Sequence, residues 1–191
     1  MDRPTVFVVG GSAGSIEALL KILPVLPADL PVPILVVVHI PPDRDSGLAG
    51  LFQEKCALSV REARDKEPLG AGTVFFAPPD YHLQVEEDGY ISLSCDEPRL
   101  FSRPSIDVLF ESAADAFGDR VTGIILSGAN HDGAQGLRAI LAGGGHGLVQ
   151  SPADARTPVM PLAALAICPT AEVRGADEIA EQLKARCGNG N

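Results

Sequence analysis

The chain has 191 residues, of which 46% are apolar and 21% charged, so we expect residues 1–191 to form a single globular domain. The formal net charge of −10 argues against a nucleic-acid partner, because proteins that neutralise phosphates need a basic surface. The longest strongly apolar run, residues 33–40, is too short to cross a bilayer, which argues against membrane insertion. The 4 cysteines lie far apart without a C-x-x-C pair, so we expect free thiols in a reducing cytoplasm.

The chain opens with a pattern typical of a βαβ unit. Residues 5–10 and 34–39 are continuously apolar, as expected for parallel strands buried on both faces. A turn of small residues follows the first run, and apolar residues then recur at helical spacing. We expect Ser15 to be the N-cap of this helix and Pro24 to end it.

The middle of the chain has a different pattern, and the end returns to the first one. Residues 81–86 and 90–94 alternate in character about a turn at Glu87-Asp88-Gly89, which predicts an antiparallel hairpin. Further strands are predicted at 72–77, 121–127 and 146–150, and helices at 104–117, 132–142, 159–167 and 176–186. Strands that alternate with helices predict an α/β fold, with a doubly wound, mostly parallel sheet and the antiparallel hairpin at its edge.

Three polar side chains stand just beyond the carboxyl ends of predicted buried strands. They are Ser12, His39 and Asp132. Ligands of doubly wound sheets bind at this edge, so these side chains can meet there. A serine hydroxyl becomes a good nucleophile when a base takes its proton and a carboxylate orients that base. The sequence therefore predicts a Ser-His-Asp triad.

The turn around Ser12 consists of small residues, which let the backbone bend sharply and a substrate carbonyl approach. The helix that follows points its free N–H groups toward the same place. The N–H of Ala13 or Gly14 is therefore our candidate for binding an oxyanion. The chain order Ser, His, Asp and the lack of a G-x-S-x-G motif argue against a lipase-like hydrolase.

Each residue taken alone also has a plainer explanation. The turn can be a simple connection or a phosphate cradle, His39 can be structural, and Asp132 can cap its own helix. Only their joint placement favours catalysis. Of the other histidines, His82 could line the pocket, His131 adjoins Asp132 too closely to face it well, and His146 belongs to a turn into a strand. No two histidines show the spacing of metal ligands.

The segments that carry these residues resemble the catalytic domain of the CheB-type protein-glutamate methylesterases. The resemblance runs in family order through residues 9–19, 38–41, 77–82, 103–110, 127–133, 152–155 and 158–161. It implies that Ser12, His39 and Asp132 form the triad of a serine esterase with a doubly wound α/β fold. It further implies hydrolysis of glutamate γ-methyl esters on the cytoplasmic helices of methyl-accepting chemoreceptors, deamidation of receptor glutamines, a role in chemotaxis adaptation, and no metal or organic cofactor.

Two departures from the well-known members bear on this resemblance. Ala13 and Ala129 replace a Thr and a Met, and that Met is associated with the oxyanion site. We place Ala13, Gly14, His82 and Ala129 around the oxyanion or substrate-binding site. The family's N-terminal receiver domain is also missing, because the first strand begins by Thr5. We therefore expect a stand-alone form or an excised domain, with control by a fused or separate regulatory domain, by the methylation level of the substrate or by recruitment.

Two other functions stay open at this stage. A non-catalytic nucleotide-binding module also begins with a strand, a glycine turn and a helix. The turn here lacks G-x-G-x-x-G, however, and His39 stands where an acidic ribose ligand is expected. A degenerate relative that only binds receptors or other proteins would keep the fold without the activity.

Overall fold

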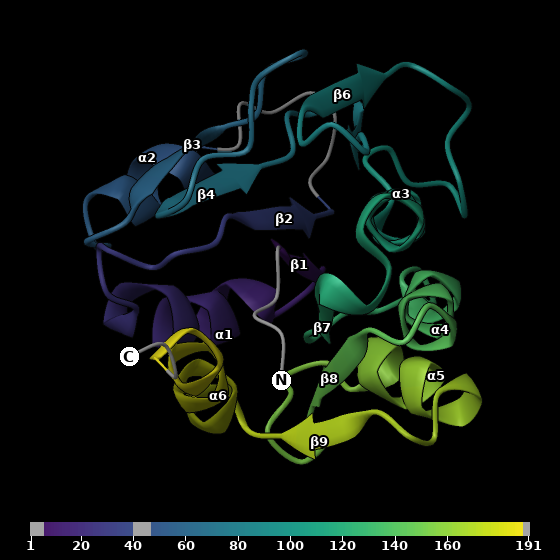
Figure 1. The fold of residues 1–191 in the computed structure, drawn as a ribbon. Helices are drawn as coiled ribbons and strands as arrows, with labels where there is room; N and C mark the ends of the chain where they lie inside the picture. The colour runs from purple at the N-terminus through teal and green to yellow at the C-terminus, as the bar shows by residue number, and fades with distance from the viewer. Residues whose placement is uncertain (1–5, 40–46, 189–191) are drawn as a thin grey trace.

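The computed structural model describes residues 6–39 and 47–188, and a parallel sheet forms its centre (Figure 1). The strands of this sheet are β1 (Val6–Gly11), β2 (Ile34–Val38), β3 (Ser59–Glu62), β4 (Thr73–Phe76), β7 (Val121–Ile125), β8 (His146–Gln150) and β9 (Glu172–Arg174). They lie in the order β3-β4-β2-β1-β7-β8-β9, and every neighbouring pair is parallel. The predicted doubly wound α/β fold is confirmed.

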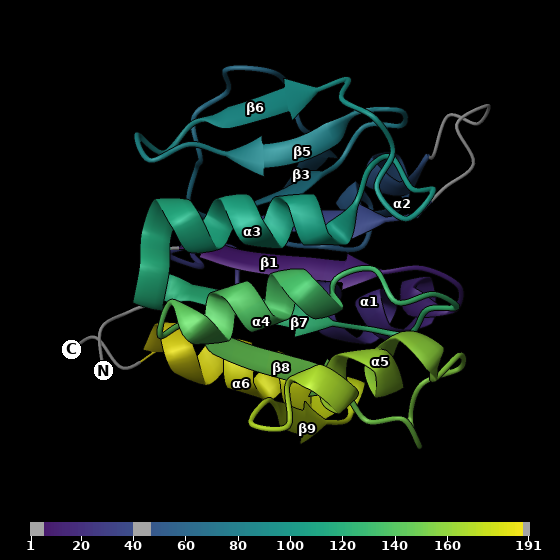
Figure 2. The same ribbon diagram turned by 90° about the vertical axis from the view of Figure 1, so that its right-hand side faces the viewer.

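Helices cover both faces of the sheet. They are α1 (Ser15–Ile22), α2 (Leu48–Gln53), α3 (Ile106–Phe117), α4 (Ala134–Ala142), α5 (Val159–Ile167) and α6 (Ala176–Gly188), with short 3₁₀ turns η1 (Leu23–Val25) and η2 (Gly118–Arg120). Helices α3, α4 and α5 pack on one face, and α1, α2 and α6 on the other (Figures 1 and 2). Alternate residues of β1 enter the two cores, as the period of a strand requires. Within the described ranges, no helix is both long and apolar enough to cross a bilayer.

The predicted hairpin is formed by β5 (His82–Val85) and β6 (Ile91–Ser94). It makes a separate 2-stranded sheet that lies over α3 (Figure 2), rather than extending the edge of the main sheet. Strands β3 and β9 already occupy the two edges of the main sheet. The buried side chains of Leu83, Val85 and Ile91 join the core on the α3 side instead.

The start of the first helix differs from expectation. Gly14, with a φ of 83°, is the N-cap of α1, and Ser15 is its first helical residue. Glycine takes this position because it tolerates positive φ without steric cost. Helix α1 ends at Ile22, before Pro24 as expected, and the 3₁₀ turn η1 follows with the proline in its first turn. Proline fits the first turn of a helix, where its missing N–H has no partner to lose.

The order of the strands brings the predicted site residues together. Strand β1 lies between β2 and β7, where the direction of the chain across the sheet reverses. Gly11 at the end of β1 is the register partner of Val38, and Gly10 is the partner of Ile125. The segments that follow β1, β2 and β7 therefore leave the sheet side by side. This is the edge at which doubly wound sheets bind their ligands.

Candidate active site

Ser12 lies in a turn whose backbone is fixed on both sides. Its N–H donates to the Ser127 carbonyl at 2.9 Å, and its carbonyl accepts from the N–H and the Oγ of Ser15 at 3.0 and 2.8 Å. A Cβ at Gly11 would lie 2.4 Å from Ser15 Cβ, so the turn closes only with glycine there. Ser12 itself is half-buried. The fold thus holds its backbone rigidly at the edge of the sheet.

His39 and Asp132 meet beside this turn. The N–H of His39 donates to the Gly11 carbonyl at 3.2 Å, and His39 Nε2 lies 2.8 Å from Asp132 Oδ2. Because a carboxylate only accepts, Nε2 must carry the ring proton, and Nδ1 is left as the basic nitrogen. The amide nitrogen of Asn130 is 3.4 Å from Nδ1, too far for a strong hydrogen bond. The structure thus brings together the base and carboxylate that the sequence predicted.

The described residues include no hydrogen bond between the Ser12 hydroxyl and His39. The two residues are nevertheless adjacent, because each directly follows one member of the register pair Gly11 and Val38. In substrate-free enzymes the bond between nucleophile and base is often long and tightens when the substrate binds. The observed geometry is therefore compatible with a triad.

The start of α3 holds the Asp132 carboxylate. Oδ1 accepts from Ser105 Oγ at 2.9 Å and from the Asp107 N–H at 3.0 Å, and Oδ2 accepts from the Ile106 N–H at 2.7 Å. Asp132 is fully buried, and burial alone would raise its pKa. The hydrogen bonds from His39 and the two backbone N–H groups outweigh burial and hold the pKa of Asp132 below its ordinary value. A carboxylate held in this way stays ionised and can orient an imidazole.

The alternative that Asp132 caps its own helix is wrong. The N-cap of α4 is Gly133, with a φ of 93° and no side-chain cap. Asp132 instead accepts the N–H groups at the start of α3. Two glycines allow this approach, because a Cβ at Gly10 or Gly133 would lie 2.2 or 2.6 Å from Ile106 Cγ2. Ile106 therefore packs against the end of β1 and the Asp132 loop at once.

The other residues predicted for the oxyanion or substrate-binding site differ in their exposure to solvent. Ala13 and Ala129 are exposed, and Gly14 is half-buried. No hydrogen bond between described residues uses the N–H of Ala13 or Gly14, so both groups are available to a ligand. Their role as oxyanion donors stays a prediction. His82, in contrast, is only 1% exposed, and both of its ring nitrogens contact backbone groups.

Neither of the two histidines that the sequence did not favour is among the described partners of the Asp132 carboxylate. His131 is exposed. His146 begins β8, at the amino end of the strand, and its Nε2 is 3.1 Å from Glu172 Oε1. Since Ser12, His39 and Asp132 follow the carboxyl ends of parallel strands, His146 belongs to the opposite edge of the sheet.

Sequence reasoning missed the donors that hold Asp132. Ser105 directly follows Pro104 at the predicted start of α3, a position where serine is a common N-cap. That signal predicts a local cap, yet the Ser105 side chain makes no cap bond to its own helix and donates to Asp132. Asn130 was also missed. Its Oδ1 accepts the Asp132 N–H at 3.1 Å and shapes the loop beneath the carboxylate.

Comparisons with known proteins agree with this geometry. The sequence pattern of the family described as CheB methylesterase matches residues 7–183. The crystal structure of the Thermotoga maritima CheB methylesterase catalytic domain superimposes with a TM-score of 0.91 at 29% identity, covering 97% of this chain and 99% of that one.

Relatives in other organisms match along most of the chain. A protein-glutamate methylesterase/protein-glutamine glutaminase of Anaeromyxobacter dehalogenans is 42% identical over 182 residues, which are 95% of this chain and 53% of that protein. A Leptospira interrogans protein, whose name assigns it the same two activities provisionally, is 43% identical over 174 residues, 91% of this chain and 90% of its own. With the family pattern matched over nearly its whole length, this chain belongs to the CheB methylesterase family.

Proposed function

We propose that this protein is a protein-glutamate methylesterase in which Ser12, His39 and Asp132 form the catalytic triad. The observation that carries the proposal is the 2.8 Å contact between His39 Nε2 and the buried Asp132 carboxylate, beside the Ser12 turn. Membership of the CheB methylesterase family supports the same reaction. Residues 6–39 and 47–188 together supply the sheet, the helices and the site, which supports a single catalytic domain.

The proposed reaction proceeds through an acyl-enzyme. Ser12 Oγ attacks the carbonyl carbon of a glutamate γ-methyl ester while His39 Nδ1 takes the hydroxyl proton, and the carbonyl oxygen becomes an oxyanion. The N–H groups of Ala13 and Gly14 are the candidate donors to that oxyanion. The C–O bond then breaks, and methanol leaves with the proton from His39. Water, activated by the same imidazole, hydrolyses the acyl-enzyme to glutamate and frees Ser12.

The substrates that we propose are methylated glutamates on the cytoplasmic helices of chemoreceptors, which places the protein in the cytoplasm. The same steps on a receptor glutamine would release ammonia instead of methanol. Both activities appear in the name of the Anaeromyxobacter relative. A regulatory domain, fused or separate, is a further expected partner.

The experiment that tests this proposal is a Ser12→Ala substitution. We expect the variant to fold and to lose methanol release from methylated receptor helices by up to about 10⁶-fold, because it lacks the nucleophile. His39→Ala should lose a similar factor. Since triad members act as a unit, the double variant should lose little more than either single one. Labelling by a serine-reactive phosphonate should disappear together with the activity.

His146→Ala is the matched control, because His146 lies at the opposite edge of the sheet. Its methanol release per folded molecule should equal that of the parent protein. Methanol release that survives in Ser12→Ala would contradict the proposed nucleophile, and additive losses in the double variant would contradict a joint role of Ser12 and His39.

A further inference from the structure

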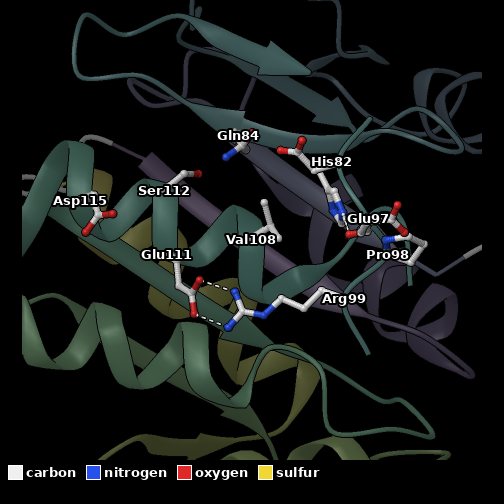
Figure 3. Close-up of a pocket in the computed structure, with 10 residues that line it drawn as sticks. His82, Gln84, Glu97, Pro98, Arg99, Val108, Glu111, Ser112 and Asp115 are labelled. Carbon is white, nitrogen blue, oxygen red and sulfur yellow. Dashed lines mark hydrogen bonds and ion pairs between the residues drawn. The ribbon is translucent and has the colours of Figure 1, made fainter. Parts of the chain in front are cut away.

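His82 is a buried side chain in contact with backbone groups on two sides. It begins β5 and points from the hairpin toward the segment that leads into α3 (Figure 3). Its Nδ1 lies 3.1 Å from the backbone nitrogen of Ser105, and its Nε2 lies 3.2 Å from the carbonyl oxygen of Glu97. The residue is 1% exposed. It therefore connects the hairpin to the N-terminal end of α3.

The two contacts determine the protonation of the ring. A backbone N–H can only donate, so Nδ1 must be the unprotonated acceptor of the Ser105 N–H. A carbonyl can only accept, so Nε2 must carry the proton that is donated to Glu97. His82 is thus neutral, in a single tautomer, whenever both bonds are formed. This ring cannot act as an acid or a base toward a substrate without losing a buried hydrogen bond.

Ser105 links His82 to Asp132, because it forms a hydrogen bond with each of them. Ser105 is fully buried and is the N-cap of α3. Its N–H donates to His82, while its hydroxyl donates to Asp132 Oδ1 at 2.9 Å. The next two backbone N–H groups of the chain also donate to Asp132. The position of the Ser105 backbone thus sets three of the donors that surround the carboxylate.

We propose that His82 is a positioning residue for the triad. By accepting the Ser105 N–H, it fixes the first turn of α3 in the orientation that keeps Asp132 ionised and aimed at His39. The inference rests on the proposed function, in which Asp132 orients the catalytic base. His82 does not touch the substrate in this role, and its placement in the substrate-binding site stays a separate prediction.

Two substitutions separate the two bonds of His82. Asparagine places its Oδ1 the same number of bonds from Cβ as histidine Nδ1, so His82→Asn keeps the acceptor for Ser105 and loses the donor to Glu97. Glutamine places its Nε2 like histidine Nε2, so His82→Gln keeps the donor and loses the acceptor. Each variant loses one buried hydrogen bond, which makes the pair a matched comparison.

We expect His82→Gln to lower kcat on the order of 10-fold with KM unchanged, the size of effect typical of residues that orient a catalytic group. The rate of phosphonate labelling at Ser12 should fall by the same factor, since labelling reports activation of the nucleophile without the receptor helix. His82→Asn, which keeps the acceptor for Ser105, should lose clearly less of both rates per folded molecule than His82→Gln, and both variants should melt at lower temperature. Equal rates in the two variants would overturn the positioning role.

Two further measurements keep the outcomes distinct. Ser12→Ala runs in parallel: methanol release that survives there would overturn the triad itself, and the role of His82 with it. The ring-nitrogen NMR spectrum of the parent protein should show His82 with a protonated Nε2 and an unprotonated Nδ1 at the assay pH. A proton on Nδ1 would overturn the inference even if His82→Gln fails to fold.

Discussion

Two aspartates at the junction of α3 and α4 are equally buried but differ in the hydrogen bonds that their carboxylates accept. Asp132 is 0% exposed and Asp107 is 1% exposed. The Asp132 carboxylate accepts from Ser105 Oγ, two backbone N–H groups and His39. Among the described residues, the Asp107 carboxylate accepts a hydrogen bond from the Gly136 N–H at 2.7 Å.

The pKa values of the two groups move in opposite directions as a result. Burial raises the pKa of Asp107, and the Gly136 hydrogen bond offsets this only in part, while the nearby Asp132 charge raises it further. For Asp132 the hydrogen bonds outweigh burial, and its pKa is lowered. The number of donors, rather than depth, therefore explains why the two pKa values move in opposite directions. Asp132 serves the candidate site as a charged group, whereas Asp107 joins α3 to α4.

The largest expected difference between the two is in turnover. Asp132→Asn should lower kcat by up to about 10⁴-fold, as the corresponding change does in serine proteases, because an amide can stabilise the wrong tautomer of His39. Either carboxylate oxygen that becomes an NH₂ group would face a donor at the start of α3. Unfolding in urea should therefore show a loss of about 1–3 kcal/mol as well. A fully active Asp132→Asn protein would remove the aspartate from the mechanism.

A smaller effect is expected when one donor to Asp132 is removed. Ser105→Ala deletes the hydroxyl but keeps the N–H that His82 accepts, so kcat should fall roughly 10-fold and less than in Asp132→Asn. Ser112→Ala is the matched control, because this serine of the same helix bonds Leu109 and Val85 instead. Both variants should lose stability, but only Ser105→Ala should lose turnover. Equal turnover in the two would mean that the hydroxyl is not needed to orient Asp132.

The parts of the fold that could be predicted are those with strong local patterns. Strands β1 and β2 are continuous runs without polar residues, β7 is rich in β-branched residues, and α3 and α4 show clear helical periodicity, so all five were expected. Helix α2 and strands β3 and β9 were missed. They have six residues or fewer, and most positions of β3 and β9 are not fully buried, so neither strand has a continuous apolar run.

The residues of the candidate site also fall into two groups, those that local patterns predict and those that depend on tertiary packing. Ser12, His39 and Asp132 could be selected because parallel strands end at one edge, so their neighbourhood follows from the strand order. The roles of Ser105 and His82 could not, because their bonds join residues 27 and 23 positions apart through the hairpin and α3. A sequence pattern indicates that Ser105 is an N-cap, but the partner of its hydroxyl depends on tertiary packing.

The smallest effects are expected from Asp107→Asn, which leaves the donors of Asp132 in place and whose amide oxygen can still accept the Gly136 N–H. Turnover should stay within about 2-fold of the parent, because no bond to the candidate site is lost. Its stability should differ from the parent mainly by ordinary packing adjustments, within roughly 1 kcal/mol. A loss of turnover comparable with that of Asp132→Asn would show that Asp107 also belongs to the catalytic machinery.

The pH dependence of stability provides the sharpest contrast between the two aspartates. For a carboxyl whose folded pKa is raised, like Asp107, the unfolded chain loses its proton first as the pH rises. The contribution of Asp107 to the stability of the parent therefore decreases as the pH rises from the pKa of the unfolded chain, about 3.9, to the pKa of the folded protein. Asp107→Asn escapes this loss, so its stability relative to the parent should increase as the pH rises from 3 to 7.

The stability due to Asp132, whose pKa is lowered, is present above the unfolded pKa and is lost as the pH falls through the folded one. Asp132→Asn should therefore become less stable relative to the parent over the same rise in pH. Urea unfolding of the three proteins at several pH values measures both trends, and constant packing differences cancel in the comparison. Trends of the same sign for the two variants would contradict the opposite directions of the two pKa shifts.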